Sequence, residues 1–394
     1  MKERLMRRAA VIGLLLATIS AGVPASADPP TDAGIAGENA AATGPTLGSL
    51  NPTTIRPGKS GKYPLYYEQP GIPKSKLMGR LAGRDVIEYD TPAKISGMGK
   101  YMAEDTKGNI WYVETREDKV IRIDPRTTEM TQYLLPRGAA PYSIAIDSND
   151  ALWITAHGIE MLLEVHPARG EVIAHQPPSH GFLIHVNIDR RTNTVWFSQP
   201  GNNQIVSYRS DKGFQEYPCP TKQAGPGRMD FDSKGNVWYP ELYTDKLAML
   251  DVKTGATTEY PLPAQGGLPA GVRIDRATDT IWVNQPMLDR LLAFRDGKFT
   301  EYAIPTAGSV VSTNVSDEDG YVWFTEGGWR GSAGGNKIGR LDPRTKKVEE
   351  MDIPYGNAQP LGMVRGQDGS IWFSLVTGAK VCRIAPRATR GKGE

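Results

Sequence analysis

Cysteine and histidine are scarce in this sequence, with 2 and 5 residues among 394. Cys219 and Cys382 lie in distant parts of the chain, so we expect no disulfide between them. The sequence has no Cys-x-x-Cys-His, Walker, dinucleotide-binding, Gly-x-Ser-x-Gly or His-Glu-x-x-His motif. It therefore predicts neither a haem nor a nucleotide cofactor.

Neither sign of charge dominates, and long hydrophobic runs are rare. Residues 1–27 hold four basic residues and one acidic residue, so the formal net charge of +2 leaves about −1 for the remainder. A chain without a basic excess is a poor fit to a nucleic-acid partner.

The N-terminal segment combines basic residues, the apolar run Ala9–Ala21 and the small residues Ala25-Ser26-Ala27. This order is typical of a signal peptide, and the apolar run is short for an uncleaved membrane anchor, which is the alternative. We therefore predict a signal peptide over residues 1–27 and export to the periplasm or medium. No membrane span is expected after its removal.

Seven tryptophans recur at nearly constant spacing: Trp111, Trp153, Trp196, Trp238, Trp282, Trp323 and Trp372. Their separations run from 41 to 49 residues, and each lies in a short apolar or β-branched run such as Ser370-Ile-Trp-Phe373. Strand-like runs with a period of about 40–45 residues are typical of a propeller with one four-stranded blade per repeat. The sequence predicts an all-β, seven-bladed β-propeller over residues 85–386.

A second marker, an extended segment ending in proline, also occurs seven times but out of phase. Its first copy, Glu88–Pro92, precedes the first repeated tryptophan, and only a basic tail at 387–394 follows the last repeat. With strands labelled A to D and tryptophan on B, the last blade lacks strand D. We predict that Val86–Asp90 supplies it and thereby closes the ring.

Residues 28–84 precede the repeats and are expected to form a flexible N-terminal extension. Up to Gly61 the segment has almost no large apolar residue, which is typical of a tether. Bulky side chains return in Tyr63–Arg84, and this part is expected to pack against the outside of the ring.

The residue that ends strand B is a candidate for ligand or metal binding, because B–C loops surround the channel mouth of a propeller. This position is Glu114, Ala156, Gln199, Glu241, Gln285, Glu326 and Leu375. Carboxylate oxygens suit divalent cations, so we predict Glu114, Glu241 and Glu326 as metal ligands and Gln199 and Gln285 as substrate contacts. Solvated strand ends would also favour polar residues, which is the alternative.

Side chains near the start of strand A lie on the same face. Tyr142 and Arg228 are predicted to contact substrate there, since a guanidinium can hold an anionic or carbonyl oxygen. His157 follows a B strand and His180 precedes an A strand in the adjacent blade. We predict that this pair provides a catalytic base, although isolated loop histidines are more often surface residues.

Several motifs in the last two repeats resemble the virginiamycin B lyase (streptogramin lyase) family of seven-bladed propellers. They are Trp323-Phe-Thr-Glu326, the run Asn336–Asp342, Pro360-Leu-Gly-Met363 and Asp368–Phe373. The resemblance covers about Val86–Ile384. It implies a carbon–oxygen lyase that linearises a cyclic depsipeptide by elimination across its ester bond, with Mg²⁺ as cofactor. Glu326 matches the family's functional glutamate, whereas Leu361 stands where the family has a histidine.

Three functions stay open from the sequence. The first is a lyase acting on an ester-linked cyclic peptide, with His157, His180 and Glu326 as catalytic residues. The second is a metal-dependent lactone hydrolase, and the third is a non-catalytic binding propeller. Each predicts a small-molecule or peptide ligand at the channel mouth, and we expect a monomer.

Overall fold

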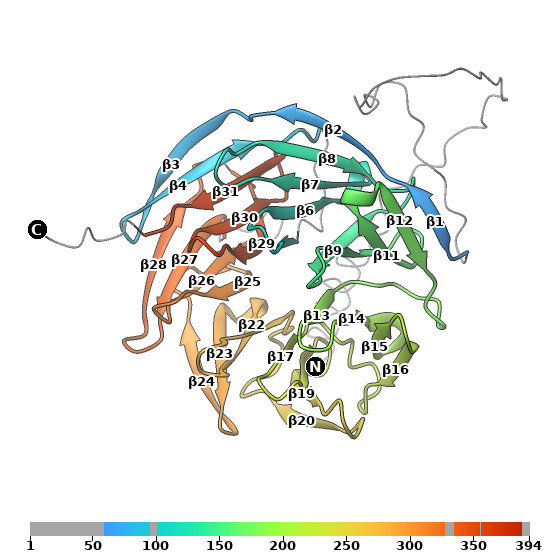
Figure 1. The fold of residues 1–394 in the computed structure, drawn as a ribbon. Coiled ribbons are helices and arrows are strands. Elements are labelled where there is room, and N and C mark those ends of the chain that lie inside the picture. Colours follow the sequence, from blue (N-terminus) through green and yellow to red (C-terminus); the bar gives the residue numbers. More distant parts are fainter. Residues whose placement is uncertain (1–58, 95–100, 328–334, 355, 388–394) are drawn as a thin grey trace, which may run out of the picture. The chain divides into compact units, whose positions relative to one another are not determined.

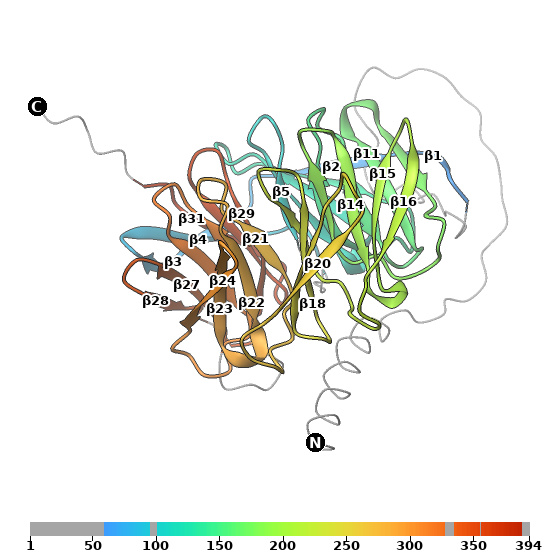
Figure 2. The same ribbon diagram turned by 90° about the horizontal axis from the view of Figure 1, so that it is seen from below.

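Seven antiparallel sheets are arranged in a ring in the computed structural model, which describes residues 59–94, 101–327, 335–354 and 356–387 (Figure 1). Each sheet is one blade, and we number the blades from the one that contains Trp111. Strand A is innermost in each, and Figure 2 shows the ring turned by 90°.

The first four blades are regular four-strand meanders along the chain. Blade 1 contains β5 (Met102–Glu104), β6 (Ile110–Glu114), β7 (Lys119–Ile123) and β8 (Met130–Leu134). Blade 2 contains β9 (Pro141–Ile146), β10 (Leu152–Ala156), β11 (Met161–His166) and β12 (Glu171–His175). Blade 3 contains β13 (Val186–Asp189), β14 (Thr194–Gln199), β15 (Gln204–Arg209) and β16 (Gly213–Pro218). Blade 4 contains β17 (Asp230–Phe231), β18 (Val237–Glu241), β19 (Lys246–Leu250) and β20 (Thr257–Pro261).

The remaining blades complete the ring. Blade 5 contains β21 (Val272–Ile274), β22 (Ile281–Gln285), β23 (Arg290–Arg295) and β24 (Lys298–Ala303). Blade 6 contains β25 (Val311–Ser316), β26 (Val322–Glu326), β27 (Lys337–Asp342) and β28 (Lys347–Asp352). Blade 7 contains β29 (Pro360–Arg365), β30 (Ile371–Leu375), β31 (Lys380–Ile384) and the N-terminal β4 (Arg84–Asp90).

The N-terminal strand closes the last blade, as the phase of the two repeats predicts. β4 pairs antiparallel with β31, and its register runs from Val86 opposite Ile384 to Asp90 opposite Lys380. The prediction is therefore confirmed. The closure leaves no open edge between the first and last blades.

The repeated tryptophans form the core between neighbouring blades, and each is at most 6 % exposed. In four blades the indole Nε1 donates to the aspartate that begins the A–B turn. Two examples are Trp111 to Asp105 and Trp323 to Asp317, both at 2.8 Å. The same aspartate accepts from turn backbone amides, so it fixes the turn and satisfies the buried indole N–H.

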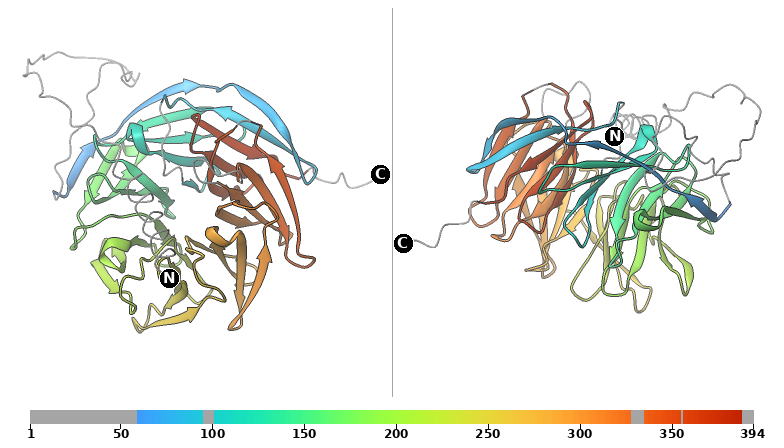
Figure 3. Two further views of the ribbon diagram at one scale, coloured as in Figure 1. Left: turned by 180° about the vertical axis from the view of Figure 1, so that it is seen from behind. Right: turned by 45° about the horizontal axis from the view of Figure 1, so that its top comes forward.

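Part of the N-terminal extension, which the sequence predicts to be flexible, forms strands that pair with the blades. β1 (Gly61–Pro64) pairs with β12, β2 (Tyr66–Gly71) with β8, and β3 (Ser75–Leu81) with β4. Each adds a fifth strand to the outer edge of blade 2, 1 or 7, and Figure 3 shows these blue strands along the outside of the ring. Backbone pairing places this stretch at the outer edges of the blades, and Leu65 and Leu81 are buried in the core.

Four 3₁₀ turns complete the described elements: η2 (Thr115–Glu117), η3 (Pro167–Arg169), η4 (Pro200–Asn202) and η5 (Pro286–Leu288). In the described ranges no helix has the length and apolar character needed to cross a membrane. The predicted signal peptide and the tail from residue 388 lie outside the described residues.

Candidate functional site

The polar residues that end the B strands are enclosed within the blades. Glu114, Gln199, Glu241, Gln285 and Glu326 are each 0 % exposed. Each stands opposite the first residue of strand C, which is lysine, arginine or glutamine in these five blades. The structure thus places the predicted ligand residues one to a blade, and each contacts groups of its own blade and the loop that leads into it.

In blades 3 and 5 the buried amide is satisfied by neutral or cationic donors. The Gln199 Oε1 accepts from the Gln204 Nε2 at 2.8 Å, and the Gln199 Nε2 donates to the Ser179 carbonyl at 3.1 Å. The Gln285 Oε1 accepts from the Arg290 Nε at 2.7 Å. These two glutamines are bound inside their blades, and their predicted role as substrate contacts stays a prediction.

Blade 6 holds two carboxyl groups together. Burial, and then the neighbouring Glu350, raise the pKa of Glu326 to about 8, although Lys337 acts in the other direction. Both Glu326 oxygens are buried without a hydrogen-bond partner among the described residues. Glu350 accepts from the Thr306 Oγ1 at 2.9 Å. Glu326 therefore carries a proton at neutral pH, unless a cation binds it.

Blade 4 repeats this arrangement in a milder form. Burial and the nearby Glu259 raise the pKa of Glu241 to about 7, while a 2.5 Å hydrogen bond from Thr244 opposes the shift. Burial raises the pKa of Glu259, but hydrogen bonds with Lys246 and Glu241 lower it, and the net shift is downward. The Glu259 Oε2 lies 2.5 Å from the Lys246 Nζ. The two carboxyls thus share one proton, and Glu241 retains it.

Glu114, Glu241 and Glu326 belong to blades 1, 4 and 6 and do not form one ligand set. Within the described ranges no group of three or more His, Cys, Asp or Glu side chains could hold a metal ion. In blade 1, Lys119 stands opposite Glu114 in the strand register and binds Glu117 at 2.5 Å. The Mg²⁺ expectation rests on the family resemblance and stays a prediction.

Three predicted residues gather with an aromatic cluster near the starts of the A strands. The His157 ring lies 4.8 Å from Phe182 and 5.8 Å from Tyr142, and Tyr142 lies 5.6 Å from Tyr101. His180 is exposed, and its Nδ1 lies 3.5 Å from a Glu160 oxygen in the loop that follows His157. The structure thus brings Tyr142, His157 and His180 to one part of the ring, and their roles stay predictions.

The histidines of this region differ in environment. Burial lowers the pKa of His157 to about 4, and burial together with Arg228 and Arg273 holds the pKa of His185 well below its ordinary value. Both rings are therefore neutral at physiological pH. A neutral imidazole can accept a proton, and His157 is the one of the two that is partly exposed.

Arg228 reaches the centre of the ring from blade 4. Its guanidinium is 5.5 Å from the Tyr101 ring of blade 1, and its Nη1 donates to the Thr313 Oγ1 of blade 6 at 3.0 Å. The side chain is 3 % exposed. This predicted substrate contact thus reaches side chains of blades 1 and 6 from blade 4.

Sequence reasoning did not single out Tyr101, Phe182, His185 or Arg273. Tyr101, His185 and Arg228 each come ten or eleven residues before the tryptophan of their repeat. This fixed offset places them on equivalent positions of the A strands, so it was a usable signal. Phe182 lies in a loop, and no repeat position marks it.

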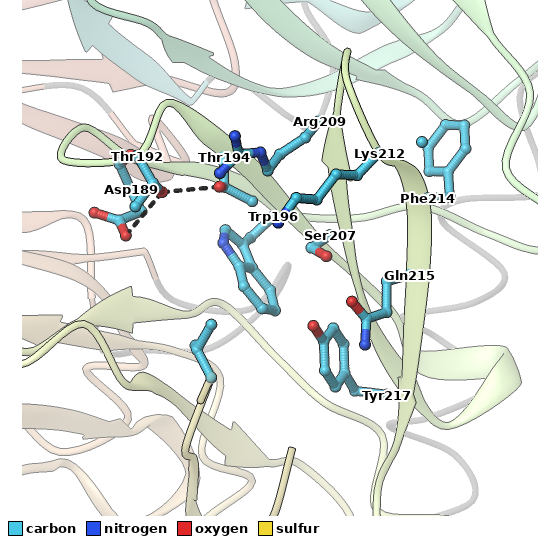
Figure 4. A pocket seen from close by; sticks show the side chains of 12 residues that line it. Asp189, Thr192, Thr194, Trp196, Ser207, Arg209, Lys212, Phe214, Gln215 and Tyr217 are labelled. Atoms are coloured by element: carbon cyan, nitrogen blue, oxygen red, sulfur yellow. Dashed lines mark hydrogen bonds between the residues drawn. The ribbon is translucent and has the colours of Figure 1, made fainter. Parts of the chain in front are cut away.

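A pocket with a volume of about 380 Å³ lies elsewhere, at the hairpin ends of blade 3 (Figure 4). Its lining includes Trp196, Arg209, Lys212 and Tyr217. Arg209 and Lys212 lie at the C–D turn, at the opposite strand end from Gln199, and Trp196 and Tyr217 extend the lining along the blade. None of the residues predicted from sequence lines it.

Comparisons with known proteins agree with the seven-bladed fold. The sequence model of the virginiamycin B lyase family matches residues 71–267 and 189–390. A virginiamycin B lyase from Nocardia farcinica (strain IFM 10152) is 31 % identical over 236 residues, which cover 59 % of this chain and 76 % of that protein.

Solved structures share the fold at lower identity. A streptogramin B lyase has a TM-score of 0.68 and 21 % identity, covering 82 % of this chain and 98 % of its own. A catalytically inactive virginiamycin B lyase from Staphylococcus aureus, solved with quinupristin, has a TM-score of 0.69 and 22 % identity. That match covers 77 % of this chain and 99 % of the other.

Proposed function

Because the chain belongs to the virginiamycin B lyase family, we propose that it is an exported carbon–oxygen lyase that opens an ester-linked cyclic peptide. The observation that carries the catalytic part is His157, a neutral imidazole packed against Tyr142 and Phe182 near the B–C loops. Aromatic side chains around a base suit a peptide ligand with apolar groups. Export is supported by the leader-like order of residues 1–27.

The chemistry asks for a base and a way to accommodate the leaving carboxylate. The base takes a proton from the carbon next to the one that bears the ester oxygen. The electron pair of that C–H bond forms a C=C bond, the C–O bond breaks, and the ester leaves as a carboxylate. His157 is unprotonated at neutral pH and fits the base, and His180, whose Nδ1 lies 3.5 Å from Glu160 in the loop that follows His157, is the second candidate for proton transfer.

Glu326 is the residue that would hold the family's Mg²⁺. Its two oxygens lack hydrogen-bond partners in the described chain and lie close to the Glu350 carboxyl, and Mg²⁺ is often bound by one or two carboxylates with water and substrate. When bound, the ion supplies Lewis-acid polarisation of the ester carbonyl.

The test is chromatography with mass detection after incubation of the mature protein with quinupristin, with and without Mg²⁺. Elimination predicts a product of unchanged mass and altered retention. His157→Ala should reduce its formation by about 100-fold or more, the usual contribution of a general base. His166→Gln is the matched control, because His166 binds Glu164 at the far end of β11.

Other outcomes of the same assay count against the lyase. A product one water heavier would indicate hydrolysis, and equal activity of the two histidine variants would remove His157 from the mechanism. If no product forms, the ligand-binding function takes precedence.

The second candidate, a non-catalytic binding propeller, is favoured by Leu361. This residue begins the A strand of blade 7 at the position where the family resemblance places a histidine, and an aliphatic side chain can neither accept nor donate a proton. Calorimetric binding of quinupristin without turnover would support this candidate.

A further inference from the structure

Arg228 joins three consecutive blades at the centre of the ring. Its backbone N–H donates to the Ala270 carbonyl of blade 5 at 3.1 Å, and the Val272 N–H donates to the Arg228 carbonyl at 3.0 Å. Its side chain then passes over blade 5 and donates to the Thr313 hydroxyl and the Ser312 carbonyl of blade 6, the latter at 3.3 Å. The guanidinium is therefore held in one place by neutral groups.

Gly271 makes this path possible. A Cβ added at Gly271 would lie 2.8 Å from both the Arg228 Nε and the Arg228 Nη2, closer than real contacts allow. Its φ is unremarkable, so the requirement for glycine here is close approach of the guanidinium and not backbone conformation.

Positive charge and unused donors accumulate at this point. The charges that affect Arg273 are those of two further arginines, Arg228 and Arg276, and of one carboxylate, Asp230. Arg276 already binds Asp230 at 2.5 Å. Burial first, and then Arg228, lower the pKa of Arg273 to about 10, so the two guanidinium groups repel each other. Within the described residues, the Nε atoms of Arg228 and Arg273 and the Nδ1 of His185 are buried without hydrogen-bond partners.

Buried N–H donors without partners are costly, so the Nε atoms of Arg228 and Arg273 favour an anion that accepts from both guanidinium groups. Arginine binds carboxylates through its fork of N–H donors. Beside the two arginines stand Tyr101 and Tyr142, which are partly exposed and 5.6 Å apart, with Phe182 at 6.5 Å from Tyr142. Groups that can bind an anion therefore lie next to aromatic side chains that can pack against a ligand ring.

We propose that Arg228 and Arg273 form a carboxylate-binding site at the centre of the ring, with Tyr101 and Tyr142 receiving an aromatic group attached to that carboxylate. The ligand class is an aromatic carboxylic acid, either free or as the C-terminus of a peptide. The site shares Tyr142 with the proposed lyase site, but His157 takes no part in it, and the calorimetric test measures binding without turnover.

The test compares two probes that differ only in charge. N-acetylphenylalanine and N-acetylphenylalaninamide are titrated into the mature protein by calorimetry at constant ionic strength. The acid should bind at least tenfold more tightly than the amide. A short peptide with a free C-terminal phenylalanine separates the two sources, since tighter binding than the acid indicates a peptide terminus and weaker binding indicates a free acid. Equal binding of acid and amide, or no binding of either, overturns the proposal.

Variants locate the effect. Arg228→Gln and Arg273→Gln should each weaken binding of the acid at least tenfold, whereas Arg209→Gln, an arginine that binds Asp211 on the surface, should leave it unchanged. Gly271→Ala keeps every charge and displaces the Arg228 guanidinium, so it serves if Arg228→Gln does not fold. Acid binding that persists in both Gly271→Ala and Arg273→Gln overturns the site, whatever the result of the lyase assay.

Discussion

Blades 3 and 5 end strand B in glutamine, whereas blades 4 and 6 end it in glutamate, at equivalent and fully buried positions. The D strand offers a glutamate in all four blades, namely Glu216, Glu259, Glu301 and Glu350. In the glutamine blades one carboxylate is held by amide or guanidinium donors. In the glutamate blades two carboxyls meet, and burial raises the pKa of the B-strand member.

Because of this difference, the residue that ends strand B makes a pH-dependent contribution to the free energy of unfolding in blades 4 and 6 but not in blades 3 and 5. Between its ordinary pKa of 4.5 and its folded pKa of about 8, Glu326 is protonated in the folded protein and ionised in the unfolded chain. Folding therefore takes up a proton in this window, and the free energy of unfolding falls as the pH rises. Glutamine makes no such contribution.

The largest effect is expected from moving a carboxyl pair into blade 3. Gln199→Glu places a second buried carboxyl beside Glu216, where the strand-C partner is the neutral Gln204. We expect a loss of about 3 kcal/mol in unfolding free energy at pH 8.5, because a buried charge without a cation is poorly compensated. The loss should be much smaller at pH 5, and urea denaturation at the two pH values measures both.

Gln285→Glu is the matched control for that change. Blade 5 has Arg290 opposite the same position, so a new carboxylate would gain an ion pair. Its destabilisation at pH 8.5 should be clearly smaller than that of Gln199→Glu. Equal losses would show that the strand-C cation does not decide which blades tolerate a carboxyl.

A change in the opposite direction should make blade 6 resemble blade 5. Glu326→Gln removes the titrating group and should raise the unfolding free energy at pH 8.5 by about 2 kcal/mol relative to the unaltered protein, with little change at pH 4.5. Denaturation with a chelator present keeps divalent ions from contributing. A variant with the same pH slope as the parent would contradict the raised pKa of Glu326.

The sequence contained most of the fold. Seven tryptophans at a fixed period predicted seven blades, and the phase of the proline segments predicted closure by β4, because both are set by strand pattern and repeat length. The outer strands β1 to β3 were missed, since they bind by backbone pairing and carry little apolar periodicity. Backbone hydrogen bonds leave a weak trace in side-chain composition.

The candidate site was less accessible from sequence. Tyr142, His157 and Arg228 could be placed on one face from strand order, but Tyr101 and Arg273 join them only because the ring brings blades 1 and 5 to a common centre. The enclosure of Glu241 and Glu326 was also missed. A polar residue at a strand end looks solvated in sequence, and only the packing of the D-strand carboxyl and the preceding loop shows that it is buried.

Blade 4 offers the smallest and most discriminating test of the comparison. Glu241→Gln should stabilise the protein at pH 8.5 in the same direction as Glu326→Gln but by about 1 kcal/mol, because the pKa of Glu241 is raised only to about 7 and Lys246 holds the partner Glu259 ionised. In both variants the benefit should begin near the ordinary glutamate pKa, and it should level off about one pH unit lower for Glu241→Gln than for Glu326→Gln, because the folded pKa values are about 7 and about 8. Equal effects in both blades, measured by urea denaturation from pH 5 to 9, would mean that burial alone sets the two pKa values and that the distance of the strand-C lysine from the pair is irrelevant. A smaller effect in blade 4 that levels off at a lower pH would assign the difference to the strand-C lysine. The Lys246–Glu259 contact of blade 4 measures 2.5 Å, whereas its counterpart in blade 6, between Lys337 and Glu350, measures 3.7 Å.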